Sequence, residues 1–138
     1  MKTLISKSMS GLSLATAFIA FTALIAKAEP PVKVYILAGQ SNMQGKGGIE
    51  GDSGNTLRSL VNGEAKKDYR FLVQNNGEWI ERKDVWIHYD LAPFQGLRHG
   101  PLKPGYGASP GQVGPEIGFG HKIGDHHDGQ VLIIKAAW

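Results

Sequence analysis

A short apolar run that ends in a glycine constrains this chain more than any other feature. Residues 34–38 read Val-Tyr-Ile-Leu-Ala, a β-branched and aromatic run typical of a buried strand. Gly39 allows a sharp turn there, and Ser41 follows. Open α/β sheets bind ligands at the carboxyl ends of their strands, where a hydroxyl can attack an acyl carbon once a base takes its proton. A plain polar turn is the alternative interpretation, because Gly, Ser and Asn are common turn residues.

Residues 1–28 have the pattern of a secretory signal peptide. Lysines lie near the start, residues 12–25 are almost wholly apolar, and small residues flank Lys27 before Glu29. The apolar stretch is shorter than the roughly 20 residues of a membrane span, although an N-terminal anchor remains the alternative. We expect cleavage before Glu29 and a secreted or periplasmic protein without stable membrane association.

Removal of the signal leaves a chain that is close to neutral. The sequence has 15 Lys and Arg against 12 Asp and Glu, and three of the basic residues (Lys2, Lys7 and Lys27) precede Glu29. Residues 29–138 therefore hold 12 residues of each sign. This balance predicts no nucleic-acid partner. The chain has no cysteine, which excludes a disulfide framework and a lipoprotein anchor.

Residues 29–138 are long enough for one small domain, but the final residues 131–138 read as a core strand. We therefore expect a domain that is truncated at its C-terminus, with an open sheet edge and an uncovered apolar face. On this interpretation, residues 29–138 are the N-terminal part of a longer domain.

The segment between these two strands has a coarser pattern. We expect a further strand at 85–89, a hairpin around Asn76-Gly77, and a short helix at 56–61 that Asn62-Gly63 ends. Glycine-rich residues 44–54 predict an exposed loop, and residues 93–115 a long irregular one.

A second helix is expected to open at Pro115-Glu116. Proline suits the first helical position, and a carboxylate there interacts favourably with the helix dipole. Its expected buried side consists of Ile117, Phe119 and Ile123.

Spacing argues against two other motifs. A Walker A phosphate loop needs four residues between its glycines and a hydroxyl after its lysine, but five residues separate Gly39 from Gly45, and glycine follows Lys46. The nucleophile elbow of α/β-hydrolases needs a glycine two residues after Ser41, where this chain has Met43.

Other residues with chemical potential have simpler interpretations. Residues 125–128, Asp-His-His-Asp, offer metal-ligand types, but we interpret them as a solvated turn between a helix and a strand. His88 lies on a predicted strand, where a structural role is expected. Trp79, Trp86 and Trp138 could stack on sugars, but core packing is the commoner use of tryptophan.

Residues 35–43, 114–120 and 131–138, in this order, resemble the sialate O-acetylesterase-like domain of carbohydrate esterases, within the SGNH-hydrolase superfamily. The resemblance implies a flavodoxin-like three-layer α/β/α sandwich with a mainly parallel sheet. It also implies hydrolysis of O-acetyl esters on sugars without metal or cofactor. It makes Ser41 the nucleophile, with its own backbone N–H as one oxyanion donor, while Gln40 and Asn42 shape the turn and the pocket.

The chain departs from this family where the base is expected. The family supplies its base from an Asp-x-x-His pair, and none of the five histidines here has an aspartate three positions earlier. The second oxyanion glycine is expected just after residue 138. We therefore expect residues 1–138 alone to be inactive, since general-base assistance is worth about 10²–10⁴-fold.

The parent protein is then expected to be an exported serine esterase that removes acetyl groups from carbohydrate, of acetylxylan or sialic-acid type, through an acyl-enzyme. Two other classes remain as alternatives. One is a non-catalytic carbohydrate-binding or scaffold protein of the same fold. The other is a phosphate- or nucleotide-binding α/β protein.

Overall fold

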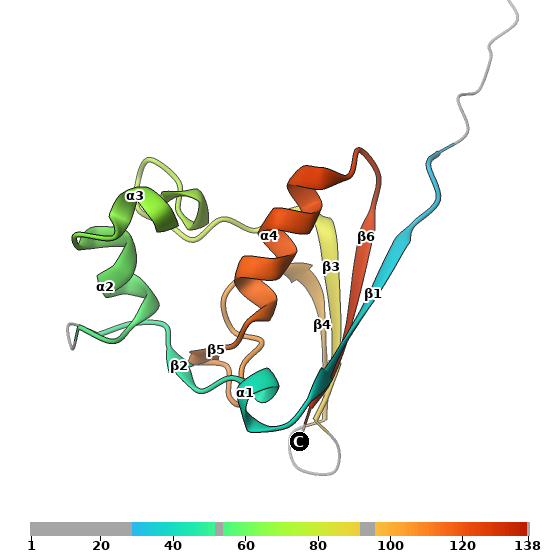
Figure 1. The fold of residues 1–138 in the computed structure, drawn as a ribbon, viewed down its shortest axis with the longest axis horizontal. Helices are drawn as coiled ribbons and strands as arrows, with labels where there is room; N and C mark the ends of the chain where they lie inside the picture. Colours follow the sequence, from blue (N-terminus) through green and yellow to red (C-terminus); the bar gives the residue numbers. More distant parts are fainter. Residues whose placement is uncertain (1–28, 52–53, 92–95, 138) are drawn as a thin grey trace, which may run out of the picture.

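The computed structural model describes residues 29–51, 54–91 and 96–137. This part of the chain contains both strands and helices (Figure 1). In chain order they are β1 (Lys33–Gly39), α1 (Ser41–Gln44), β2 (Gly47–Gly48), α2 (Leu57–Asn62), α3 (Lys66–Tyr69), the 3-10 turn η1 (Arg70–Leu72), β3 (Arg82–Asp90), β4 (Leu97–Leu102), β5 (Gln112–Val113), α4 (Glu116–His126) and β6 (Val131–Ala137).

The described strands form a mixed four-stranded sheet in the order β1-β6-β3-β4, and β2 pairs with β5 in a separate small sheet. β6 is parallel to both of its neighbours, whereas β4 runs antiparallel to β3. Gly39 therefore lies beside Ala137, so the carboxyl ends of β1 and β6 meet at one edge. The α/β class and the strands expected at 34–38, 85–89 and 131–138 are confirmed, although Trp138 lies outside the described residues. The burial expected for the strand at 34–38 is wrong, because β1 lies at the edge of the described sheet and none of its residues is buried.

The core lies between the sheet and α4. Alternate residues of β3 point inward, so that Val85, Ile87 and Tyr89 are buried, and Val131 and Ile133 of β6 lie beside them on the same face. Figure 1 shows α4 packed along this face, with α2 and α3 farther out on the same side.

The opposite face of the sheet carries exposed apolar side chains. Val34 and Ile36 of β1 are 53% and 70% exposed, and Trp86 of β3 is 44% exposed. The expectation of an uncovered apolar face agrees with this arrangement. The core position expected for Trp86 is wrong, because the strand alternation that buries Val85 and Ile87 turns Trp86 outward.

The long loop expected at 93–115 is wrong in part, because it contains strands β4 and β5. β4 includes Pro101, which is compatible with a strand at the edge of the described sheet. Gly100, at φ +148°, adopts a backbone conformation that other residues rarely reach. The tertiary pairing with β3 thus prevails over a local composition that favours a loop.

The expected short helix is confirmed as α2. The Thr56 side chain accepts a hydrogen bond from the Ser59 N–H, and the Ser59 hydroxyl accepts one from the Thr56 N–H, which forms a capping box. The turn at Asn76-Gly77 is also confirmed, with a single bridge between Val73 and Trp79 in place of two full strands.

The loop expected at 44–54 is less exposed than its composition indicates. Gly45 and Ile49 are buried, and Gly47–Gly48 forms β2. None of the helices in the described ranges is both long and apolar enough to span a membrane.

Burial of His121 on α4 makes stability depend on pH. Its side chain is almost fully buried, and burial together with the nearby Arg82 cation lowers its pKa from 6.5 to about 4, while Asp125 and Asp84 partly oppose the shift. The unfolded chain then binds more protons between these two values. The free energy of unfolding should therefore fall as the pH decreases from about 6.5 to about 4.

Chemical denaturation of the wild type and of His121→Leu across this range checks the prediction. The variant should lack this part of the pH dependence, whereas His88→Gln, at an exposed histidine of β3, should keep it. An identical pH profile for wild type and His121→Leu would assign the effect to other groups.

Candidate active site

Ser41 begins α1 directly beyond the carboxyl end of β1, as the sequence predicts. The Gln44 N–H donates to the Gln40 carbonyl at 2.8 Å, and the Gly45 N–H donates to the Ser41 carbonyl at 3.0 Å. These bonds hold a single helical turn with Ser41 exposed at its start. Gly39 is required at this turn, because a Cβ there would lie 2.8 Å from the Cβ of Met43.

A cavity of about 460 Å³ opens beside Ser41. Two stretches of chain form its walls, and the small β2-β5 sheet joins them through the pairing of Gly47 with Val113. The lining residues are Ser41, Asn42, Gly45, Lys46, Gly47, Val113, Gly114 and Pro115. Of the predicted site residues, Ser41 and Asn42 thus share one cavity, whereas Gln40 supports the turn through its carbonyl group.

Gly45 brings the turn against the opposite wall of the cavity. It has φ +81°, and a Cβ at this position would lie 2.2 Å from the Cα of Gly114. The Gly45 carbonyl also accepts a hydrogen bond of 2.7 Å from the Ala108 N–H. Close backbone approach, which only glycine permits, therefore docks the Ser41 turn onto the 106–114 loop.

An ion pair lies buried behind this wall. The Lys135 ammonium of β6 is 2.6 Å from the Glu116 carboxylate of α4, and both side chains are 0% exposed. Lys135 also donates to the carbonyls of Gln44 and Tyr106, and Glu116 accepts a hydrogen bond from the Gly114 N–H. Burial lowers the pKa of Lys135, while the Glu116 carboxylate raises it and Arg98 adds a smaller lowering effect.

The sequence patterns did not predict this pair. A favourable interaction with the helix dipole accounts for the position of Glu116 on α4 but not for its full burial. A signal was present, since Lys135 follows Val131 and Ile133 at a spacing of two and therefore falls on the core face of the strand.

The five histidines lie on elements other than the Ser41 turn. His88 and His99 are exposed on adjacent positions of β3 and β4, and His121 is buried on α4. His126 and His127 lie where α4 ends, and His127 shares a 2.6 Å hydrogen bond with the Tyr35 hydroxyl. Within the described ranges, no hydrogen bond joins the Ser41 hydroxyl to a histidine.

The segment 125–128 has mostly exposed side chains, as expected, but its first two residues are the end of α4 and only the other two belong to the turn before β6. Among the residues that the structure describes, no group of three metal-ligand side chains is close enough to hold an ion. Trp79 is half-buried. The guanidinium carbon of Arg58 lies 4.1 Å from the centre of its ring, and its ring N–H donates a 2.6 Å hydrogen bond to the Glu50 carboxylate.

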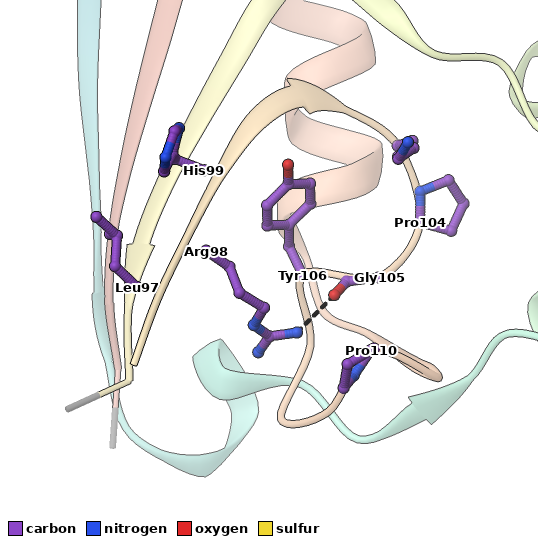
Figure 2. Close-up of a pocket in the computed structure, with 8 residues that line it drawn as sticks. Leu97, Arg98, His99, Pro104, Gly105, Tyr106 and Pro110 are labelled. Carbon is purple, nitrogen blue, oxygen red and sulfur yellow. Dashed lines mark hydrogen bonds between the residues drawn. The ribbon is translucent and has the colours of Figure 1, made fainter. Parts of the chain in front are cut away.

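A second cavity of about 450 Å³ lies between β4 and the loop that follows it. Figure 2 shows the Arg98 side chain extending from β4 to this loop, where it donates to the Gly105 carbonyl. Arg98 also donates to the Gly107 carbonyl, and the Tyr106 hydroxyl donates to the Pro101 carbonyl. Arg98 therefore serves to hold the loop that supports the Ser41 turn.

A comparison with protein families gives a match over most of the chain. The family described as "Carbohydrate esterase, sialic acid-specific acetylesterase" matches residues 31–138. The chain belongs to this family. Membership confirms the resemblance seen in the sequence, and it supports carbohydrate acetylesterase function in general terms. No curated protein and no solved structure matches the chain in the corresponding searches.

Close approach at Gly45 can be tested in this esterase domain. Gly45→Ala would place a methyl group against Gly114 and force a left-handed backbone on alanine, which itself costs about 1–2 kcal/mol. We expect the free energy of unfolding to fall by roughly 3 kcal/mol or more, in the range of overpacked sites. Chemical denaturation measures the change.

Gly77→Ala is the matched control, because Gly77 has φ +84° but a Cβ added there would meet no heavy atom within 4 Å. It should lose only the backbone contribution. Equal losses in the two variants would mean that the contact with Gly114 is unimportant.

Proposed function

We propose that Ser41 is the nucleophile of a serine acetylesterase that acts on carbohydrate. The carrying observation is the exposed Ser41 at the carboxyl end of β1, beside a cavity of about 460 Å³ in a chain of this esterase family. A base takes the proton of the Ser41 hydroxyl, and its oxygen attacks the acetyl carbonyl carbon. The sugar hydroxyl leaves with a proton, and water then releases acetate from acetyl-Ser41.

The backbone is proposed to contribute the first oxyanion donor. Ser41 is the first residue of α1, and N–H groups of a first helical turn have no partner within the helix. The Ser41 N–H is therefore available to an acyl oxygen, as the family resemblance implies. Asn42 lines the same cavity and Gln40 accepts the bond that closes the turn, which supports their proposed role in shaping the site.

The base is proposed to be the histidine of an Asp-x-x-His pair, as in the family that the sequence resembles. Since no histidine in residues 1–138 has an aspartate three positions earlier, reading the gene beyond codon 138 tests this part of the proposal directly. Residues 1–138 alone are accordingly proposed to be inactive. The substrate is an acetylated carbohydrate, of acetylxylan or sialic-acid type.

The finer fold is also a proposal. We propose that the working domain is a flavodoxin-like three-layer sandwich, in which a second helical layer covers the sheet face opposite α4. The exposed side chains of Val34, Ile36 and Trp86 support this proposal, because burial of apolar surface is worth about 25 cal/mol per Å².

Export can be tested at the N-terminus. Cleavage after Ala28 should give a mature protein that begins at Glu29 in the secreted or periplasmic fraction, because residues 1–28 have the order of a signal peptide. Mass spectrometry of the exported protein measures this end. Recovery of intact residues 1–28 in the membrane fraction would instead support an N-terminal anchor.

Replacement of the nucleophile tests the proposed chemistry. In the complete gene product, Ser41→Ala should lower kcat/KM for an aryl acetate or an acetylated sugar by several orders of magnitude, because the covalent route is lost. The exposed position of Ser41 predicts little change in folding, which circular dichroism measures. Asn42→Ala should lower kcat/KM less, since its proposed role is to shape the site.

Ser109→Ala is the matched serine control, since Ser109 does not line this cavity, and it should keep wild-type activity. Wild-type activity in a folded Ser41→Ala protein would refute the esterase mechanism. Sugar binding without turnover, in wild type and Ser41→Ala alike, would favour a non-catalytic carbohydrate-binding protein.

A further inference from the structure

The ion pair of Glu116 and Lys135 lies directly behind the wall of the Ser41 cavity. Gly114 lines this cavity, and a Cβ on Gly114 would lie 2.6 Å from Glu116 Oε2 and 3.2 Å from Lys135 Nζ. One glycine residue thus separates the pair from the space that a substrate would occupy. Because both charged side chains are 0% exposed, neither can contact solvent or a ligand directly.

The three hydrogen bonds of the Lys135 ammonium reach three different parts of the chain. It donates to Glu116 Oε2 at 2.6 Å, to the Gln44 carbonyl at 2.9 Å and to the Tyr106 carbonyl at 2.6 Å. An ammonium has three donors, so all are used. Gln44 is the last residue of the helical turn that begins with Ser41. The pair is therefore one hydrogen bond away from the turn that carries the hydroxyl.

The Glu116 carboxylate extends the same connection to the other wall of the cavity. Its Oε1 accepts a 2.8 Å hydrogen bond from the Gly114 N–H, which turns this N–H inward to the pair. Gly45 of the Ser41 turn packs against Gly114 and accepts a hydrogen bond from Ala108. The two walls of the cavity therefore contact each other close to the ion pair, which is hydrogen-bonded to both of them.

We propose that Glu116 and Lys135 are positioning residues for Ser41, which fix the α1 turn against the 106–114 loop and so set the direction of attack on the ester. The inference rests on the proposed role of Ser41 as nucleophile. Its physical basis is that misplacement of a reacting group by about 1 Å can lower a rate on the order of a hundredfold. A supporting network behind the reacting residue provides this accuracy.

A positioning role can be separated from a stabilising one, because both charges of a buried ion pair can be removed together with little effect on stability. Replacing both charges by uncharged side chains of similar size is often neutral for stability, whereas removing one partner leaves an unpaired buried charge. The double variant Glu116→Gln/Lys135→Met removes both charges with little change in volume. It leaves an acceptor for the Gly114 N–H but no donor for the carbonyls of Gln44 and Tyr106.

The experiment compares this double variant with wild type and Ser41→Ala in the complete gene product. We expect a melting temperature close to wild type and a fall in kcat on the order of tenfold to a hundredfold, with little change in KM. The Ala108 amide, which donates from the loop to the Gly45 carbonyl, and the Gly45 amide, which donates to the Ser41 carbonyl and closes the turn, should exchange hydrogen faster in the double variant.

Arg82→Met is the control for loss of an ion pair elsewhere. Arg82 pairs with Asp84 and Asp125 at 2.6 Å, at the start of β3 and therefore at the end of the sheet away from Ser41. This variant should lower the melting temperature and leave kcat unchanged. A loss of kcat similar to that of the double variant would assign both effects to general destabilisation and overturn the inference.

Other outcomes separate the two proposals. Wild-type kcat in a folded double variant, with inactive Ser41→Ala, would overturn the positioning role and leave the esterase function standing. Activity in Ser41→Ala would overturn the esterase function. Hydrogen exchange in the double variant would then test the docking of the turn by the ion pair, and unchanged exchange at Gly45 and Ala108 would refute that docking role. If this double variant does not fold, Glu116→Met/Lys135→Met, which also removes both charges and leaves neither one unpaired, is measured against the same criteria.

Discussion

The buried pair of Lys135 and Glu116 is the interaction on which the arrangement of this domain depends. Moving two charges out of water carries a penalty of several kcal/mol for each ion, so such a pair persists only where hydrogen bonds satisfy both groups. Here the ammonium has three acceptors and the carboxylate has two donors, from Lys135 and Gly114. This requirement joins β6, α4, the Ser41 turn and the loop at Tyr106 at one point.

Local patterns of the sequence predicted the elements that have local causes. The strand at β1 and the short helix α2 each depend on near neighbours, and both elements were confirmed, although β1 is not buried as expected and Thr56 caps α2. Strand β4 was not predicted, since Gly100 and Pro101 favour a loop and only pairing with the distant β3 makes this segment a strand. The core position expected for Trp86 rested on its residue type, whereas its outward direction follows from its place between the buried Val85 and Ile87.

The candidate site also has a part that local sequence predicts and a part that it does not. The position of Ser41 could be predicted because the strand, Gly39 and Ser41 are close neighbours in the sequence, and the carboxyl end of a strand lies at the edge of a sheet. The opposite wall at Gly114 and the pair behind it come from residues up to 91 positions from their partners, as in the bond from Lys135 to Gln44. Nothing in the local sequence specifies these long-range contacts. However, Lys135 follows Val131 and Ile133 at the strand spacing of two residues, which indicates a buried cation that needs a partner.

The two charged networks on the α4 side of the sheet also show why burial matters more than the number of ion pairs. Arg82 binds two carboxylates, but Asp84 and Asp125 are 41% and 61% exposed, so solvent screens these pairs and their geometry can relax. The Lys135 pair is fully enclosed, and movement of any partner would leave a buried donor or acceptor without its hydrogen bond. An enclosed network therefore tolerates far less displacement than an exposed one. Among the described residues, this enclosed network lies at the end of the sheet where Ser41 lies, and it bonds directly to the backbone turn that carries the hydroxyl.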